Sequence, residues 1–434
     1  MFSQRIQRAC NLKSFLVDAL EICRANAYDA RDNPRGIINL GTAENKIIYD
    51  IIGEKLSEVD MKQIPEKYSH YCNFCGNDEF RDKLASMFNH YMKPKLTIKR
   101  ENLFVTNGGG PAVECLGIAF CDKHEGFLTP APYYGAFYND LRQRSETIIY
   151  PAQLSSKSIG SGSYNMTTQD LEFALEEAKQ NGVAIKALLI TNPYNPLGTI
   201  FSLKELEAYA QFCLKHNIHF ICDEIYYFSV FDEEASMKSI LSLPNFAKYK
   251  DIIHVIWAFS KDFGLSGYRC GVIISYNDYL LKALGQISIY TTVPTVAQYA
   301  LESIVSDFNW IDRFNNQNHE RLKGALRTVT KTLDDVGVKY IKPSGGFFIW
   351  LNLSNYLKSD TEEDEKKLYE LFMQNGLYIA PGFAFYSREH GWFRVVFSID
   401  GEQLKLALKR FAICIKTLDG VKKVGDAVKK LSLN

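Results

Sequence analysis

Short apolar runs alternate with longer amphipathic stretches between about residues 100 and 275. Such runs are typical of buried strands, and the stretches between them carry the spacing of surface helices. The alternation predicts an α/β fold with a mainly parallel sheet covered by helices. The expected strands are residues 103–106, 187–191, 219–222, 252–257 and 272–275. Each is followed by residues of chemical use, and ligands collect at the carboxyl ends of such strands, so we expect the site there.

The C-terminal part of the chain carries a different pattern. Beyond Pro294, a helical pattern with many charges and no breaker runs from residue 297 to about 336. A strand at residues 347–351, a helix at about 363–375 and a strand at 392–397 follow. These elements predict a smaller α+β unit.

The length of 434 residues is too great for one ordinary core, so we expect two domains. The divisions that we predict are an N-terminal arm at residues 1–50 that joins the small domain, a large domain at 51–296 and a small domain at 297–434. The cleft between the two domains is the default position for a binding site.

The overall charge favours a small-molecule protein. Fifty basic and fifty acidic residues give a net charge of zero, so no long-range field favours nucleic acid or an acidic membrane as partner. No apolar stretch approaches the roughly 20 residues that span a bilayer. Only Cys72 and Cys75 among ten cysteines form a C-x-x-C pair, which alone does not predict a metal site. We expect reduced thiols in a cytoplasmic protein.

The first 17 residues allow a second location. They carry Arg5, Arg8 and Lys13 and no acidic residue, a pattern that resembles a mitochondrial presequence. The alternative, which we prefer, is an amphipathic arm that docks on the body of the protein.

One lysine directly follows a predicted buried strand. Lys261 lies in the sequence Ser260-Lys261-Asp262, and Arg269 follows it by eight residues. Partial desolvation after a core strand lowers the pKa of a lysine, as a Schiff-base amine requires. The guanidinium of Arg269 suits a phosphate. A lysine and an arginine at this spacing are more often a solvated surface pair, but the strand and the neighbouring glycines favour a site.

An acidic residue ends another predicted strand. Asp223 would be costly there without a cationic partner, and a protonated pyridine nitrogen would serve. Tyr226 and Asn195 could both reach the phenolic oxygen of such a ring. Asn195 by itself precedes a proline, and such a residue is more commonly a turn residue.

A glycine-rich loop, Asn107-Gly108-Gly109-Gly110, lies between a predicted strand and a predicted helix. Bare amides at a helix N-terminus can bind a phosphate. The spacing does not match the dinucleotide motif G-x-G-x-x-G. Downstream, Tyr134 could stack on a flat ring, although a core aromatic is the alternative.

Together these residues resemble the class I/II aminotransferases, which depend on pyridoxal 5'-phosphate (PLP), and most closely the 1-aminocyclopropane-1-carboxylate (ACC) synthase branch. The similar stretches are residues 39–45, 191–199, 222–226, 260–271 and 391–395. The resemblance implies the aspartate-aminotransferase fold (fold type I) and a homodimer with active sites at the subunit interface.

The resemblance also implies a role for each matching residue. Lys261 would hold PLP and shuttle the proton, and Asp223 would pair with the pyridine nitrogen. Tyr226 and Asn195 would bind the phenolic oxygen. The PLP phosphate would be bound by Arg269, Ser260 and the glycine loop with Gly109 and Gly110, and Tyr134 would stack on the ring. Arg394 would bind the substrate α-carboxylate, and Glu44 would lie near the substrate.

Three departures from the family pattern lie among the residues that would bind the PLP phosphate. Ala258 stands where the family usually has serine or threonine, Gly110 where it has threonine, and Phe74 where a tyrosine reaches the neighbouring subunit's phosphate. Each change removes one hydroxyl donor, and a hydrogen bond to a charged group contributes roughly 1.5–3 kcal/mol. We therefore expect weaker PLP binding.

The reaction remains open at this stage. All enzymatic alternatives act on an α-amino acid through an external aldimine and removal of the Cα proton. An ACC synthase then converts S-adenosylmethionine to ACC and methylthioadenosine, whereas an aminotransferase passes the amino group to a keto acid. The third alternative is a non-catalytic regulatory protein with the same fold, which the three missing hydroxyls motivate.

Overall fold

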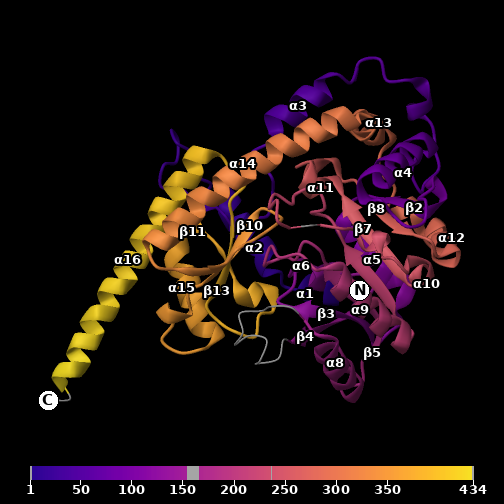
Figure 1. Cartoon of the computed structure of the whole chain (residues 1–434). Coiled ribbons are helices and arrows are strands. Elements are labelled where there is room, and N and C mark those ends of the chain that lie inside the picture. Colours follow the sequence, from indigo (N-terminus) through magenta and orange to yellow (C-terminus); the bar gives the residue numbers. More distant parts are fainter. Residues whose placement is uncertain (1, 154–165, 236, 433–434) are drawn as a thin grey trace.

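The computed structural model describes residues 2–153, 166–235 and 237–432 (Figure 1). A seven-stranded sheet organises the larger half, and β8 alone among its strands runs antiparallel to the rest. Across the sheet the strands are β2 (Leu103–Thr106), β8 (Gly271–Ser275), β7 (Ile253–Ala258), β6 (His219–Asp223), β5 (Ala184–Thr191), β3 (Glu125–Ala131) and β4 (Ile148–Gln153). The expected α/β class with a mainly parallel sheet is confirmed.

The five strands expected from apolar runs are present, and two more were missed. β3 contains Gly126 and Pro130, and β4 contains Pro151, residues that usually interrupt a strand pattern. The strand expected at residues 272–275 differs from the other four in its direction. Because β8 is antiparallel, its carboxyl end at Ser275 lies at the far edge of the sheet, and its beginning, next to Arg269, lies at the edge where the other strands end.

Both faces of the large sheet are covered, as its apolar strands require. Alternate strand residues pack on α5 (Gly109–Phe120), α6 (Ala136–Arg142) and α12 (Asp278–Ile287) on one face. On the other face lie α3 (Tyr49–Ser57), α4 (Asp78–Met92), α8 (Thr168–Gln180), α9 (Leu203–His216), α10 (Phe246–Tyr249) and α13 (Thr295–Val305). α8 and α9 begin with capping boxes at Thr167 and Ser202, which define their first turns.

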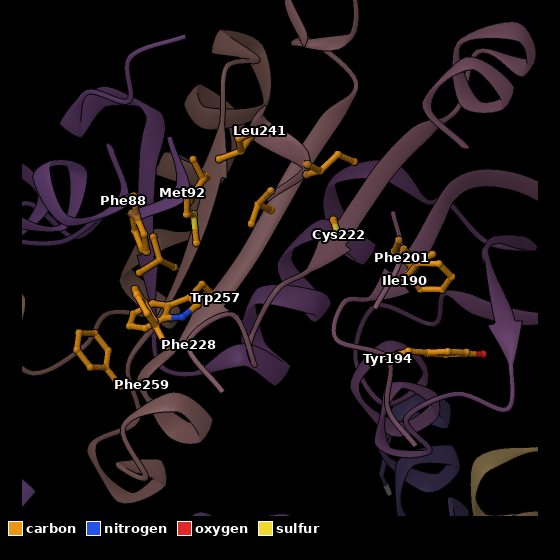
Figure 2. Close-up of a cluster of buried hydrophobic side chains, with 14 of the residues drawn as sticks. Phe88, Met92, Ile190, Tyr194, Phe201, Cys222, Phe228, Leu241, Trp257 and Phe259 are labelled. Atoms are coloured by element: carbon orange, nitrogen blue, oxygen red, sulfur yellow. The ribbon is translucent and has the colours of Figure 1, made fainter. Parts of the chain in front are cut away.

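Aromatic residues fill the core behind the expected lysine. The ring of Trp257 packs edge-on against Phe88 at 5.4 Å and Phe259 at 4.8 Å between centroids (Figure 2). Such edge-to-face pairs add to the burial of apolar area. This packing makes the end of β7 a rigid base for the short helix α11 (Phe259–Asp262), which carries Lys261.

The smaller half contains an antiparallel sheet in the order β12 (Ala380–Pro381), β13 (Trp392–Val396), β10 (Phe348–Asn352) and β9 (Lys339–Ile341). It packs with α15 (Glu362–Gln374) and α16 (Gly401–Ser432). The N-terminal segment forms α1 (Gln4–Asn11) and α2 (Phe15–Ala25), and its strand β1 (Ile38–Asn39) pairs in parallel with β11 (Leu377–Tyr378). Phe15 packs edge-on against Tyr369 and Phe383, so the first segment contacts the smaller half.

The long helix expected from residue 297 is two helices. α13 ends at Val305, and Asp307 then caps the N-terminus of α14 (Phe308–Asp335). Asp307 also binds Lys55, at 2.8 Å, which holds the break in place. The first turns of α14 pack into the core of the large sheet and the later turns into the core of the small sheet, so α14 joins the two halves (Figure 1). In the described chain no helix combines the length and apolar character needed to cross a membrane.

Candidate active site

A cavity of about 240 Å³ opens where the parallel strands of the large sheet end. The ends of β5, β6 and β7 and the first turn of α5 supply its walls, as expected for an open α/β sheet. Its lining includes nine of the residues that the sequence indicated: Gly109, Gly110, Tyr134, Asn195, Asp223, Tyr226, Ser260, Lys261 and Arg269.

Lys261 projects into this cavity from α11. Its Nζ donates a hydrogen bond of 2.6 Å to the carbonyl of Ala43. Burial lowers the pKa of Lys261 to about 8, and the positive charges of Arg394 and Arg269 add to this effect. About a tenth of the amine is therefore neutral at pH 7, far more than for an ordinary lysine, and the neutral form can act as a nucleophile.

The adjacent Asp262 has a structural role. Its buried carboxylate accepts hydrogen bonds from the Trp257 indole at 2.9 Å, the Ser229 hydroxyl at 2.7 Å and the Phe228 amide at 3.1 Å. Three donors satisfy a carboxylate that would otherwise be costly to bury. These bonds hold the turn that presents Lys261.

Asp223 faces the cavity as a buried carboxylate, and its one hydrogen bond within the described chain comes from the amide of Ile225 at 3.2 Å. Burial raises its pKa to about 7, and the negative charges of Asp140 and Glu224 contribute. A cation placed in the cavity would reverse this cost, because an opposite charge favours the ionised carboxylate.

Tyr226, Asn195 and Arg394 form a chain of polar contacts beside the cavity. The amide nitrogen of Asn195 lies 3.5 Å from the Tyr226 hydroxyl, a long hydrogen bond, and the Asn195 oxygen accepts from Arg394 Nη1 at 2.8 Å. Burial raises the pKa of Tyr226 well above its ordinary value, so its hydroxyl stays protonated and can donate.

Arg394 is only 2% exposed, although no carboxylate of the described residues pairs with it. Its Nη2 donates to the Gly41 carbonyl at 2.6 Å, and its guanidinium lies 4.6 Å from the ring centroid of Phe385. Among the residues that the structure describes, acceptors are found for only two of its five N–H donors, and Nε has no partner. A buried arginine with free donors suits a carboxylate ligand.

The glycine loop forms the opposite end of the cavity. Gly108 has φ of +124°, and a Cβ there would lie 2.3 Å from Arg269 Nη2, so only glycine allows this approach. α5 begins at Gly109, and its first residues line the cavity together with Ser260 and Arg269, so the N-terminal amides of the helix are available to an anion there. Arg269 itself is held by a 2.9 Å bond to the Ser266 carbonyl.

Glu44 lies next to the cavity and does not line it. Its carboxylate accepts from the Ser266 hydroxyl at 3.2 Å and pairs with Lys46 at 3.3 Å. Tyr134 does line the cavity, with its ring edge-on to Phe137 at 5.3 Å, and burial raises its pKa to about 12.

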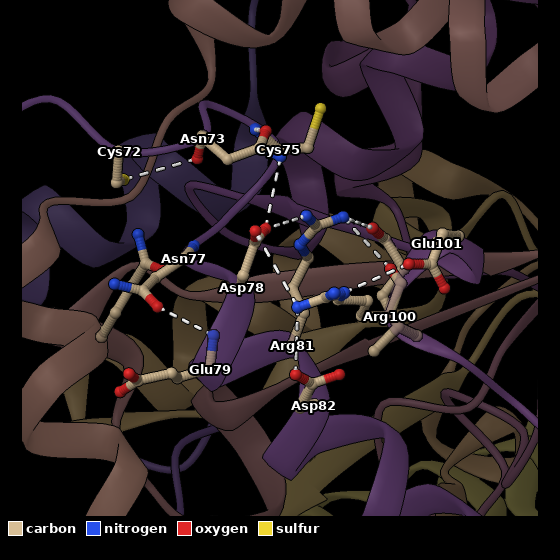
Figure 3. A network of polar contacts seen from close by, with 12 residues as sticks. Cys72, Asn73, Cys75, Asn77, Asp78, Glu79, Arg81, Asp82, Arg100 and Glu101 are labelled. Atoms are coloured by element: carbon tan, nitrogen blue, oxygen red, sulfur yellow. Dashed lines mark hydrogen bonds and ion pairs between the residues drawn. The ribbon is translucent and has the colours of Figure 1, made fainter.

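The three departures from the family pattern occupy different positions. Ala258 is fully buried behind Gly109, and Gly110 lines the cavity. Phe74 precedes α4, whose first turn is held by a network in which Arg81 binds Asp78 at 2.5 Å and the Arg100 carbonyl at 3.1 Å (Figure 3). The carbonyl of Phe74 accepts from the Thr292 hydroxyl at 3.3 Å.

Sequence reasoning missed several lining residues, chiefly Asp140 and Ser266. Phe137 also lines the cavity, and Asp140 lies three positions later on the same face of α6. Tyr134 was expected to stack on the ligand, and Phe137 and Asp140 follow it at intervals of three residues. This helical spacing could have indicated Asp140 as a lining residue. Ser266 offered no comparable signal, since its place depends on the turn before Arg269.

The residues present fit PLP. A partly neutral lysine, a buried carboxylate that forms no ion pair with any described residue, and a helix N-terminus beside an arginine surround one cavity. These groups match an aldehyde, a pyridine nitrogen and a phosphate respectively. Among the described residues no group of three or more His, Cys, Asp or Glu side chains is placed to hold a metal ion, and the ten cysteines are free thiols.

Residues 35–411 of the chain match the model of the family described as "Aminotransferase class I and II". The ACC synthase-like protein 1 of Bos taurus is 36% identical over 402 residues, which are 92% of this chain and 79% of that protein. A human protein named "Probable inactive 1-aminocyclopropane-1-carboxylate synthase-like protein 2" is 34% identical over 387 residues, 88% of this chain and 68% of its own length.

The fold is similar to that of a solved structure, aspartate aminotransferase from Thermus thermophilus with maleate. The TM-score is 0.79, with 95% of this chain and 99% of the other covered. At 21% identity, this likeness shows that the two proteins share fold type I, and it carries no information about the substrate.

Proposed function

Because the chain belongs to the class I and II aminotransferase family, a PLP-dependent family, with ACC synthase-like relatives, we propose that it binds PLP and acts on an α-amino acid. The observation that carries this proposal is the cavity that brings together Lys261 and Asp223, with Arg394 beside it. Lysine, carboxylate and buried arginine are respectively suited to an aldehyde, a pyridinium and a substrate carboxylate.

PLP, when bound, serves as an electron sink for the carbanion that forms when an amino acid loses its Cα proton. The protein's own residues bind and orient the reactants. Lys261 would supply the amine and then move the proton at Cα, and Asp223 would keep the pyridine nitrogen protonated. Tyr226 would donate to the phenolic oxygen together with Asn195. Gly109, Gly110, Ser260 and Arg269 would bind the phosphate, and Tyr134 would stack on the ring.

We propose an ACC synthase-like reaction on S-adenosylmethionine as the first candidate, since the names of the relatives favour it. Arg394 would bind the α-carboxylate, and Glu44, held by Ser266, would lie near the substrate. The second candidate is transamination between an amino acid and a keto acid, which uses the same residues. The third is a non-catalytic role, and the name of the human relative together with Ala258, Gly110 and Phe74 supports it.

One experiment separates the three candidates. The purified protein is mixed with PLP and desalted, its visible spectrum is recorded, and S-adenosylmethionine or amino acid–keto acid pairs are added. Formation of ACC and methylthioadenosine supports the first candidate, and a new keto acid without methylthioadenosine supports the second. A retained cofactor band without turnover of any substrate favours the third. If no band survives desalting, the proposal of a PLP enzyme fails.

We also propose a homodimer. The rings of Tyr71 and Phe74 pack at 5.9 Å between centroids, and the Phe74 carbonyl accepts from the Thr292 hydroxyl at 3.3 Å, so these two residues lie next to the segment of Ile289 and Tyr290. Tyr71 is 96%, Ile289 58% and Tyr290 74% exposed, so these residues form an exposed, largely apolar patch. The patch adjoins the glycine loop, since the amide of Asn107 donates to the Thr291 carbonyl at 2.8 Å. An exposed aromatic patch beside a site is typical of a subunit interface. Light scattering that gives the mass of one chain at micromolar concentration would contradict this proposal.

Substituting Ala258→Ser should tighten PLP binding. Ala258 lies directly behind Gly109 at the phosphate end, and a hydroxyl there adds one donor. A hydrogen bond to a charged group contributes about 1.5–3 kcal/mol, so we expect the dissociation constant to fall about 10- to 100-fold. Fluorescence titration with PLP measures it. An affinity that stays the same or weakens would show that the buried hydroxyl does not reach the phosphate.

A further inference from the structure

Asp140 occupies the phosphate end of the cavity. It lies on α6 and lines the cavity together with Gly110 and Arg269. A Cβ placed on Gly110 would lie 3.0 Å from Asp140 Oδ1 and 3.2 Å from Oδ2. The carboxylate therefore fills the space over the first turn of α5 where a side chain at position 110 would otherwise lie.

In the part of the chain that the structure describes, the carboxylate of Asp140 has no protein partner. Within residues 2–153, 166–235 and 237–432 it accepts no hydrogen bond and forms no ion pair, not even with Arg269. Such an acid at the edge of an anion-binding loop needs an explanation, because two negative groups at hydrogen-bond distance repel each other strongly.

The charged and titratable groups around Asp140 favour its protonated form. Glu114 on α5 raises its pKa, and Glu114 itself is paired with Arg144 at 3.1 Å. Tyr134 and Asp223 also line the cavity and interact with Asp140. The positive charge of Arg269 acts in the opposite direction and lowers the pKa of Asp140. Burial is the largest cause, and together these effects raise the pKa of Asp140 to about 7.

We propose that Asp140, in its protonated form, is a hydrogen-bond donor to the cofactor phosphate and takes the place of the hydroxyl missing at Gly110. A protonated carboxyl offers one O–H donor, and an O–H bond to an anionic oxygen is among the strong hydrogen bonds. The proton stays on Asp140 and no covalent bond changes. This inference deepens the proposed function and rests on it.

The consequence is a proton uptake linked to cofactor binding. A bound phosphate raises the pKa of Asp140 further, because a nearby negative charge favours the neutral form. Below a pH of about 7 the free protein already carries this proton, so Asp140 then adds no pH dependence. Above that pH, binding must take up the proton, and the affinity for PLP should fall by up to about tenfold per pH unit.

The experiment uses the full chain and titration calorimetry with PLP and with pyridoxal, which lacks the phosphate. Titrations between about pH 7.5 and 9, in buffers of different ionisation enthalpy, give the number of protons that the protein takes up on binding. In this pH range the phosphate, with a second pKa of about 6, is already dianionic and takes up no proton itself. Wild type is compared with Asp140→Asn, which keeps a donor without a charge. Asp122→Asn, at an exposed position, is the matched control.

When PLP binds, wild type and Asp122→Asn should each take up close to one proton more than Asp140→Asn does. Near pH 9, Asp140→Asn should bind PLP at least about tenfold more tightly than wild type does. With pyridoxal, proton uptake should be the same in all three. Equal uptake of protons with PLP in wild type and Asp140→Asn overturns the inference and leaves the proposed function standing. If Asp140→Asn does not fold, the test uses wild type alone. The inference is then overturned if wild type takes up no more protons when it binds PLP than when it binds pyridoxal. If neither PLP nor pyridoxal binds wild type, the proposed function fails, and the inference falls with it.

Discussion

Lys261→Ala should abolish turnover and the visible band of the lysine-linked cofactor. The variant loses both the amine that binds the aldehyde and the group that moves the Cα proton, since Lys261 is the lysine that lines the cavity. We expect the rate of amino-acid turnover to fall by about 10³-fold or more, in the range for loss of a positioned acid–base group. Single-turnover assays and absorption spectra measure both effects.

The fold should survive this substitution. The turn that presents Lys261 is held by the three hydrogen bonds of Asp262, which alanine leaves in place, and the lysine itself donates only one bond. The melting temperature and the oligomeric state should therefore match those of wild type. Lys250→Ala, at a surface lysine, is the control and should keep full activity. Residual wild-type activity in Lys261→Ala would refute the assignment.

The pH dependence of cofactor loading should follow the same lysine. Burial lowers the pKa of Lys261 to about 8, so the neutral amine becomes the major form as the pH rises through that value. Loading with pyridoxal, which has no phosphate and is therefore independent of the phosphate end, should become faster up to about pH 8 and then level off. A rate that keeps rising toward the ordinary lysine pKa would contradict this shift.

Arg394→Lys should raise the KM for the amino acid about 100-fold with little change in cofactor binding. The planar fork of arginine can bind both oxygens of a carboxylate, and a lysine amine cannot. Loss of one charge-assisted hydrogen bond costs up to about 3 kcal/mol, which corresponds to about 100-fold in affinity. Steady-state kinetics give the KM, and the visible spectrum after desalting reports the cofactor.

Arg410→Lys is the matched control for the structural part of this effect. Arg410 also donates to backbone carbonyls, those of Gly36, Gly376 and Pro34, but it lies away from the cavity. Both variants should lose stability because both break such bonds. Only Arg394→Lys should raise KM. A similar KM in both variants would show that Arg394 supports the fold and does not bind substrate.

Local pattern was enough to predict most of the fold. The apolar runs at β2, β5, β6, β7 and β8 are buried on both faces, so each appears in the sequence as an unbroken run bounded by polar residues. β3 and β4 escaped because Pro130 and Pro151 are tolerated in them by tertiary context. The break between α13 and α14 also escaped, since it depends on the Asp307–Lys55 pair between distant segments.

The sequence by itself determined the chemistry available at the site. Lys261 and Asn195 follow strands of the sheet and Asp223 ends one, and the ends of parallel strands lie at one edge of a sheet. Only the tertiary structure decided how those groups are charged and what stands beside them. The antiparallel course of β8 brings Arg269 to this edge, and α6 places Asp140 over Gly110. A pKa depends on burial and on the charges of residues far apart in the chain, and a linear pattern of residues does not contain those distances.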